Sequence, residues 1–186
     1  MRLADLDGQR VVVWGWGNEG RAARQLLRRH ARPASVVVID DQEQASDPDV
    51  RRGADSRAAL AEATVVVKSP GVPLRIARAA GKPVTGGTQL WFASTGGART
   101  IGVTGSKGKS TTSSLIAHLL DSVGVAAVLA GNVGRALLDL LDADLVDPAP
   151  DSARWNVLEL SSFQCAEVEY SPQIGVLTAL FPEHLD

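Results

Sequence analysis

Residues 102–111 read Gly102-Val103-Thr104-Gly105-Ser106-Lys107-Gly108-Lys109-Ser110-Thr111 and join two segments of different periodicity. The preceding run, residues 100–103, is apolar and predicts a strand. In residues 109–123 the apolar side chains recur at intervals of three and four. This spacing predicts a helix with one buried stripe, made of Leu115, Ile116, Leu119, Leu120 and Val123. A glycine-rich connection between such a strand and such a helix is typical of a phosphate-binding loop.

The chemistry of this loop suits a nucleotide. Glycines let backbone N–H groups surround phosphate oxygens, and the start of the helix adds a positive partial charge. Lys109 is placed to reach the β- and γ-phosphates, and the Ser110 hydroxyl suits Mg²⁺. The strict pattern has a glycine where this chain has Val103, so a glycine turn without a ligand is the alternative. The candidate ATP contacts are Gly105, Ser106, Lys107, Gly108, Lys109, Ser110 and Thr111.

A second glycine loop, Gly15-Trp16-Gly17-Asn18-Glu19-Gly20, follows an apolar run at residues 11–14, and Asp40 comes twenty residues after Gly20. This spacing is that of a dinucleotide-binding turn with an acid for the ribose. Such a turn on its own is a weak signal. NAD and a different nucleotide diphosphate both remain open as ligands, and Trp16 either covers the ligand or packs in the core.

Polar residues near the end of the chain form a third candidate group. Glu159 lies inside the apolar run 157–160, where a carboxylate is costly unless it is paired or binds a metal. Beside a nucleotide loop it predicts a Mg²⁺ ligand, with a surface ion pair as the alternative. Ser161 and Gln164 follow at the same strand end, and His184 follows a strand predicted to end at residue 180. Cys165 is predicted to be a small buried apolar residue.

Strands and helices alternate throughout the chain, which predicts an α/β protein with parallel sheets covered on both faces. The predicted strands are residues 11–14, 35–39, 64–67, 100–103, 125–129, 155–160 and 174–180. The predicted helices are residues 19–30, 57–62, 74–80, 88–93, 109–123 and 135–141, and residues 41–53 and 142–152 are predicted loops. A linker at residues 94–97 separates a Rossmann-like domain, 1–94, from a P-loop α/β domain, 95–186.

The composition excludes several classes of protein. With 21 acidic and 19 basic residues and a pI near 5.9, the chain is not a basic nucleic-acid clamp. One cysteine excludes an internal disulfide framework and a multi-cysteine metal site. No apolar run approaches the roughly 20 residues of a membrane span. We therefore expect a cytoplasmic protein with neither nucleic acid nor a membrane as partner.

Four motifs together resemble the Mur ligases of peptidoglycan synthesis, in their order and spacing. They are residues 104–111 (TGSKGKST), 131–134 (GNVG), 158–164 (LELSSFQ) and 183–186 (EHLD). The runs 158–164 and 68–71 (KSPG) are most similar to members that add glutamate. Residues 14–21, 86–92 and 181–186 are more similar to a group that adds L-glutamate. The resemblance covers the whole chain.

The resemblance implies an ATP- and Mg²⁺-dependent ligase that joins L- or D-glutamate to UDP-N-acetylmuramoyl-L-alanine through an acyl-phosphate. It implies catalytic roles for Lys109, Asn132 and His184 and metal ligation by Ser110, Glu159 and His184. The implied contacts to the UDP part are Gly15, Trp16, Gly17, Asn18, Asp40, Asp41, Ser69, Pro70 and Gly71. Asn132, Ser161 and Gln164 are implied to lie at the reacting carboxyl or the muramoyl group.

The resemblance implies that these 186 residues comprise one uridine-binding domain and the first part of a truncated ATPase domain, without the glutamate-binding domain of the family. We therefore expect the isolated chain to lack ligase turnover. A non-catalytic nucleotide-sugar-binding remnant is the alternative closest to this reading. An NAD-dependent oxidoreductase leaves the Lys109 loop unexplained, and a P-loop kinase or GTPase leaves the first domain unexplained.

Overall fold

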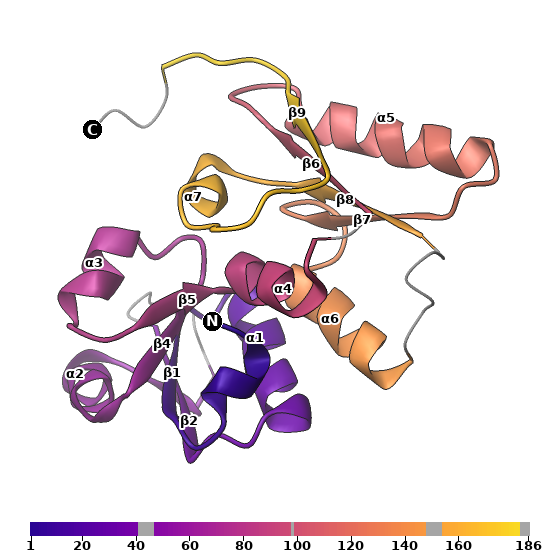
Figure 1. Ribbon diagram of the computed structural model, residues 1–186. Coiled ribbons are helices and arrows are strands. Elements are labelled where there is room, and N and C mark those ends of the chain that lie inside the picture. Colours follow the sequence, from indigo (N-terminus) through magenta and orange to yellow (C-terminus); the bar gives the residue numbers. More distant parts are fainter. Residues whose placement is uncertain (41–46, 98, 148–153, 183–186) are drawn as a thin grey trace. The chain divides into compact units, whose positions relative to one another are not determined.

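The computed structural model describes residues 1–40, 47–97, 99–147 and 154–182. It is an α/β structure whose strands pair in parallel within two sheets (Figure 1). The chain divides into two compact units, Met1–Ser94 and Thr95–Asp186. The predicted fold class, with parallel sheets and intervening helices, is confirmed.

Unit 1 contains a five-stranded sheet in the order β3-β2-β1-β4-β5. Its strands are β1 (Arg10–Trp14), β2 (Ser35–Ile39), β3 (Val50–Arg51), β4 (Val65–Lys68) and β5 (Val84–Gly86). Its helices are a 3₁₀ turn at Leu3–Leu6, α1 (Asn18–His30), α2 (Gly53–Glu62), α3 (Leu74–Ala79) and α4 (Gly87–Thr95). The chain leaves β1 toward β2 on one side and returns to β4 on the other. Ligands of open α/β sheets bind at such a switch point, beyond the carboxyl ends of the strands.

The apolar strands of unit 1 are buried because helices cover the sheet. Val12 and Ile39 pack with Ala59 of α2 and with Ala63, which follows that helix. Their neighbours Val11 and Val13, which point to the other face, are also buried. Burial on both faces explains why these strands are continuous valine runs without a polar alternation.

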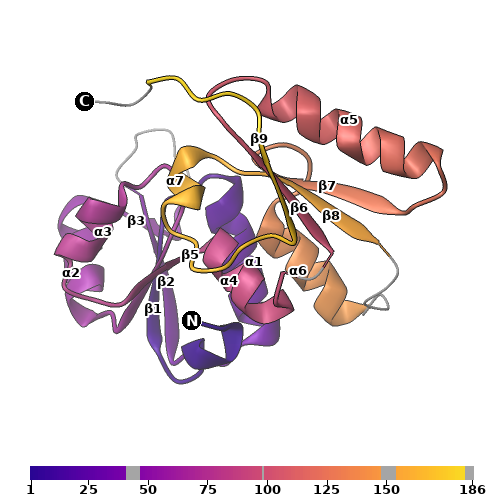
Figure 2. The ribbon, with the colours of Figure 1, turned by 45° about the horizontal axis from the view of Figure 1, so that its top comes forward.

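Unit 2 contains a four-stranded sheet in the order β7-β8-β6-β9. Its elements are β6 (Thr100–Thr104), α5 (Lys109–Ser122), β7 (Ala127–Gly131), α6 (Leu137–Val146), β8 (Trp155–Glu159), α7 (Ser162–Cys165) and β9 (Ile174–Leu177). α5 lies along one face of this sheet (Figure 2). There Ile116 and Leu120 pack against a buried cluster of Ile101, Val103 and Val157.

Several sequence predictions about this fold are wrong. The predicted loop 41–53 contains β3, and β5 precedes α4; these edge strands of two and three residues leave no periodic signal. Residues 142–146, predicted as loop, belong to α6, which ends before Pro148. Of the five residues in the predicted stripe, only Ile116 and Leu120 pack on the sheet, since Leu115, Leu119 and Val123 are exposed. Cys165 is exposed.

Within the described ranges, no helix combines the length and apolar character that a membrane crossing requires.

Candidate functional site

The glycine loop of unit 2 adopts a conformation that depends on its glycines. Gly105 has φ of 136° and Gly108 has φ of 84°, which are values that other residues rarely adopt. Gly108 is the N-cap residue, immediately before the first residue of α5. A Cβ atom on Gly105 would also approach the Ala179 carbonyl oxygen to 2.7 Å. The loop therefore runs closely against the chain that follows β9.

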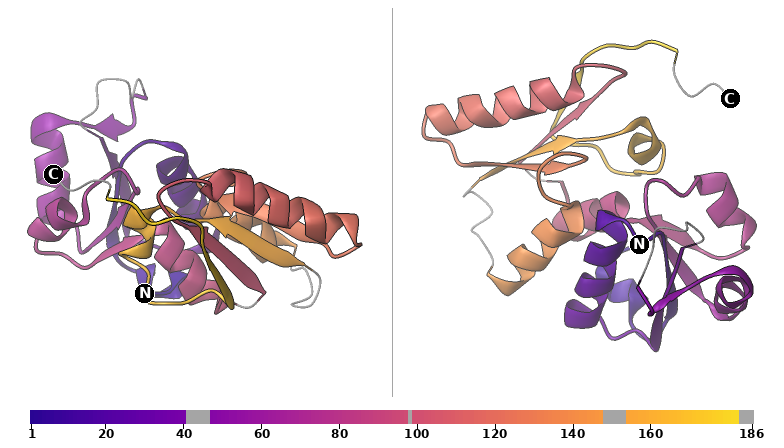
Figure 3. Two further views of the ribbon diagram at one scale, coloured as in Figure 1. Left: turned by 90° about the horizontal axis from the view of Figure 1, so that it is seen from above. Right: turned by 180° about the vertical axis from the view of Figure 1, so that it is seen from behind.

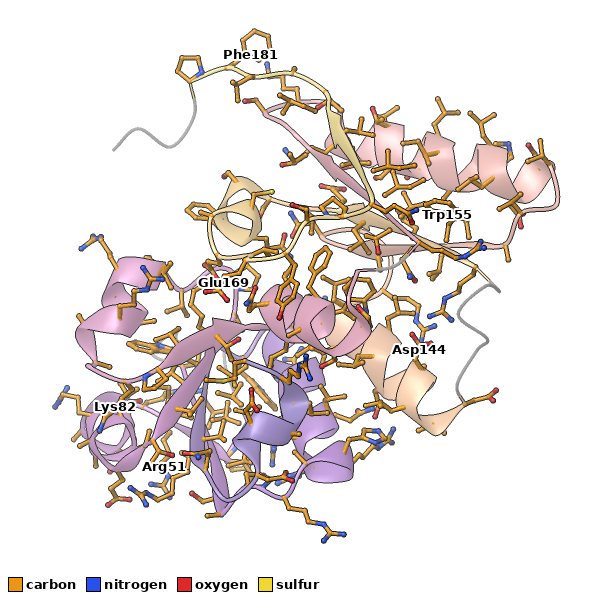
Figure 4. The ribbon with its side chains drawn as sticks, viewed as in Figure 1. Arg51, Lys82, Asp144, Trp155, Glu169 and Phe181 are labelled. Atoms are coloured by element: carbon orange, nitrogen blue, oxygen red, sulfur yellow. The ribbon has the colours of Figure 1, made fainter. Side chains whose placement is uncertain are left out.

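That following chain, residues 178–181, braces the loop by hydrogen bonds. The Ser106 N–H donates to the Ala179 carbonyl oxygen at 2.8 Å. The Ser106 hydroxyl lies 3.0 Å from the Phe181 carbonyl oxygen, to which it donates (Phe181 is labelled in Figure 4). The Thr178 hydroxyl donates to the Lys107 carbonyl oxygen at 2.6 Å. Sequence reasoning missed these contacts because they join residues more than 70 positions apart.

Thr178→Val tests this brace, because it removes the hydroxyl and keeps the shape of the side chain. We expect a loss of about 1 kcal/mol in the free energy of unfolding and a several-fold weaker affinity for ATP. Urea denaturation and calorimetry measure the two effects. Thr178→Ser keeps the hydroxyl and should restore both. An unchanged affinity in Thr178→Val would show that the loop does not depend on the brace.

Lys109 lies inside the loop. Its ammonium donates to the carbonyl oxygens of Gly105 at 2.7 Å and Ser106 at 3.2 Å. A positive charge is thereby held where the loop and the start of α5 can receive phosphate oxygens. Ser110 and Thr111, in the first turn of the same helix, are exposed.

Glu159 ends β8 between the two strands that carry the other candidate residues. In register it lies beside Val103 of β6 and Gly131 of β7, and its carbonyl oxygen accepts the Asn132 N–H at 3.0 Å. The residue is 4% exposed, and among the described residues its Oε2 atom has no hydrogen-bond partner. Leaving a buried carboxylate oxygen without a partner is costly.

This arrangement fits a hard cation, since Mg²⁺ takes one or two carboxylates together with phosphate oxygens. Across the described ranges, no group of three or more His, Cys, Asp or Glu side chains could hold a metal by itself. His184, the other predicted ligand, lies outside the described residues, as does Asp41 of the predicted uridine site.

Glu159→Gln tests the cation site without measuring catalysis. In metal-free buffer we expect the variant to unfold at no lower temperature than the parent chain, because it removes a buried charge. The additional stabilisation by Mg²⁺ over ATP alone should disappear. Thermal unfolding with EDTA, with ATP and EDTA, and with ATP and Mg²⁺ separates these effects. Glu62→Gln, on the exposed end of α2, is the control, and a full Mg²⁺ response in Glu159→Gln would contradict the assignment.

A cavity of about 440 Å³ lies beside the glycine loop within unit 2, and neither Glu159 nor Ser110 is among its lining residues. It is lined from four segments of the chain, and five of the predicted site residues contribute to it: Gly105, Ser106, Lys109, Asn132 and Ser161. Cys165 and several exposed apolar side chains complete the lining. A charged loop and an apolar wall in one cavity suit a ligand that carries both phosphates and less polar groups.

Gln164 is buried rather than exposed to this cavity. Its side-chain oxygen accepts hydrogen bonds from the Ser161 N–H at 2.9 Å and the Ser161 hydroxyl at 3.0 Å. These bonds form a capping box at the start of α7. Gln164 thus orients Ser161, and its contact with a muramoyl group stays a prediction.

The glycine loop of unit 1 is held to the neighbouring strand ends. Gly15, with φ of 102°, donates its N–H to the Ile39 carbonyl oxygen at 2.8 Å. The Ser69 hydroxyl donates to the Gly15 carbonyl oxygen at 3.3 Å. The Asp40 carboxylate accepts the Trp16 N–H at 2.6 Å. The fold thereby brings the Gly15 loop, Asp40 and the turn that begins at Ser69 together at one end of the sheet.

Trp16 is buried beneath the arginines of α1. The guanidinium groups of Arg21 and Arg24 lie 5.4 and 5.3 Å from the centre of its ring, which is a cation–π distance. Gly17 and Asn18 begin α1 and are exposed, and Pro70 and Gly71 complete the turn after Ser69. Of the two readings of Trp16, the geometry favours packing.

Unit 2 has the features of the α/β nucleotide-binding class: a glycine loop between a strand and a helix, a lysine inside it and a buried acid at the neighbouring strand end. Residues 103–186 match the Mur ligase middle domain. Most of unit 2 is thus similar in sequence to the middle domain of Mur ligases.

Two similar relatives carry the name UDP-N-acetylmuramoyl-L-alanine–L-glutamate ligase. The protein of Micromonospora sp. is 49% identical and that of Salinispora tropica is 48% identical, over the whole of this chain and 42% of each relative. The chain thus spans less than half the length of these relatives. A solved structure with the same fold is UDP-N-acetylmuramate:L-alanyl-gamma-D-glutamyl-meso-diaminopimelate ligase from Neisseria meningitides. It is 20% identical over 95% of this chain and 62% of its own, with a TM-score of 0.53.

Proposed function

We propose that this chain forms the nucleotide-binding part of an ATP-dependent ligase that joins L-glutamate to UDP-N-acetylmuramoyl-L-alanine. The observation that carries the proposal is 49% identity, over the whole chain, to a relative with that activity in its name. The choice of L-glutamate rests on the relatives' names. In this proposal unit 1 is the uridine-binding domain, unit 2 is part of the ATP-binding domain, and the protein acts in the cytoplasm, where ATP is available.

The proposed reaction has two steps. A carboxylate oxygen of the muramoyl substrate attacks the γ-phosphorus of ATP, the bond to the β-phosphate oxygen breaks, and ADP leaves. The glutamate amine then attacks the acyl carbon, phosphate leaves with the carbon–oxygen electron pair, and the amine loses a proton. The product is an amide.

In this scheme the residues of unit 2 act by positioning and by charge. The loop N–H groups and the Lys109 ammonium bind phosphate oxygens and offset their charge. Glu159, Ser110 and His184 would hold Mg²⁺, which neutralises charge on the transferring phosphoryl group. Asn132 and Ser161, which line the same cavity, would orient the carboxyl group that reacts.

In unit 1 the Gly15 loop and the start of α1 would bind the diphosphate. Asp40 and the turn of Ser69, Pro70 and Gly71 would border the uridine. As at the Lys109 loop, the backbone N–H groups at a helix N-terminus favour the binding of an anion. The glycine fingerprint thus serves a diphosphate other than that of NAD.

Calorimetry with the 186-residue chain tests the proposal. We expect UDP-N-acetylmuramoyl-L-alanine and ATP with Mg²⁺ to bind, and NAD not to bind. Binding of NAD without binding of the uridine nucleotide would overturn the assignment of unit 1. Binding of the uridine nucleotide without binding of ATP would favour a nucleotide-sugar-binding module.

A further inference from the structure

Lys68 is a buried lysine at the end of the sheet where unit 1 would bind its ligand. Its side chain is among the largest fully buried ones of the chain, and the residue is 2% exposed. Lysine is almost never fully buried unless its charge interacts with other groups, because taking an ammonium out of water is costly. Because burying this charge is costly, its position points to a functional role for Lys68.

The position of Lys68 follows from the strand register. It is the last residue of β4, beside Trp14 of β1 and Gly86 of β5. Trp14 immediately precedes the Gly15 loop, and paired strands lie about 5 Å apart. Gly86 has no side chain, which leaves room beside β4 for the lysine stem. The charge thus lies close to the loop.

The ammonium also contacts the turn that faces this loop. The Lys68 Nζ donates to the Ser69 carbonyl oxygen at 3.2 Å. Ser69 is tied to β1, because its N–H donates to the Trp14 carbonyl oxygen at 2.8 Å and its hydroxyl donates to Gly15. Ser69 thus links the Lys68 ammonium to the Gly15 loop by hydrogen bonds on both sides.

We propose that Lys68 is a positioning residue for the diphosphate of the unit 1 ligand. It holds the Ser69 turn against the Gly15 loop and supplies a fixed positive charge behind the diphosphate, which solvent and salt screen weakly because the charge is buried. The loop N–H groups and the start of α1 would contact the phosphates directly. This inference rests on the proposed uridine-diphosphate site of unit 1.

The test compares UDP with uridine, which lacks the phosphates. Lys68→Met keeps the length of the side chain and removes its charge. Lys68→Gln also removes the charge but keeps a donor for the Ser69 carbonyl oxygen. We expect both variants to bind UDP at least about tenfold more weakly than the parent chain, which corresponds to about 1.4 kcal/mol. Their affinity for uridine should change less than about twofold. Calorimetry measures UDP binding, and saturation-transfer NMR measures uridine binding.

Lys82→Met is the matched control. Lys82 lies in unit 1, and its ammonium also donates to a backbone carbonyl oxygen, that of Ala61, at 3.3 Å (Lys82 is labelled in Figure 4). It precedes β5, so it lies at the amino end of that strand, away from the loop. This variant should bind UDP as the parent chain does.

The outcomes distinguish a failure of the proposed Lys68 role from a failure of the proposed uridine-diphosphate site. If the parent chain does not bind UDP, both the proposed uridine site and the proposed role of Lys68 are wrong. If the parent chain binds UDP and Lys68→Gln binds it equally well, the uridine site stands and the inference is wrong. An equal loss for UDP and uridine would also overturn it, because the lysine would then only support the fold. Should Lys68→Met not fold, as judged by circular dichroism, Lys68→Gln decides.

Discussion

Lys109→Ala should lower the affinity of the chain for ATP by at least about tenfold, and as much as about a hundredfold. A hydrogen bond to a charged group contributes about 1.5–3 kcal/mol, and the variant removes such bonds to phosphate together with the charge itself. The same ammonium donates hydrogen bonds to two carbonyl oxygens of its own loop, those of Gly105 and Ser106. The effect on stability should therefore be small compared with the effect on binding.

Calorimetry with ATP and Mg²⁺ measures this affinity, and urea denaturation measures the stability. Lys82→Ala is the control for the loss of one lysine, because Lys82 lies in the other unit. UDP affinity, which depends on unit 1, should be the same in both variants. Unchanged ATP affinity in Lys109→Ala would show that residues 105–111 are a glycine-rich turn and not a phosphate loop.

Gly20→Ala should destabilise unit 1 by about 2 kcal/mol, although alanine favours helices more than glycine does. Gly20 lies in the first turns of α1 and is buried. An added Cβ atom would overlap the Gly15 carbonyl oxygen and lie 2.9 Å from its carbon. Because both atoms belong to backbone, α1 would have to move away from the loop. The gain of about 1 kcal/mol from helix propensity cannot offset such a clash.

Thermal unfolding measures this change, and a loss of about 2 kcal/mol corresponds to a decrease of several degrees in a chain of this size. Gly175→Ala, in β9, is the control for adding a methyl group without a clash, since no atom of the described residues outside its immediate chain neighbours lies within 4 Å of the added Cβ and its φ is not positive. It should unfold within about 1 °C of the parent chain. If Gly20→Ala were equally stable, the close contact between α1 and the Gly15 loop would be wrong.

Local patterns were enough to predict the main elements of the fold. The valine runs became β1, β2 and β4, and the strand–loop–helix pattern around residues 102–111 became β6, its glycine loop and α5 (Figure 3). These elements could be predicted because each is marked by its own residues: a β-branched run, a glycine that accepts positive φ, or apolar residues at helical spacing.

The short edge strands could not be predicted in this way. β3 and β5 form only because β2 and β4 offer backbone partners beside them. Ile116 and Leu120 of α5 pack on the sheet, whereas Leu115 and Leu119 of the same helix are exposed, although all four side chains are large and apolar. Periodicity shows that a helix has an apolar side, but packing decides which residues of that side are buried.

For the candidate site, too, local sequence was enough to predict some features, whereas others became visible only in the tertiary structure. The sequence alone was enough to select the Lys109 loop, the acid of β8 and the second glycine loop as candidates, since each proposed chemistry requires those residue types at that spacing. Only the tertiary structure showed that Thr178 braces the Lys109 loop, that Gln164 caps α7 and that Lys68 is buried at the strand end beside Trp14. These contacts join strand ends that are adjacent in a parallel sheet but distant along the chain, and the pairing of strands is settled by packing of the whole unit rather than by local sequence.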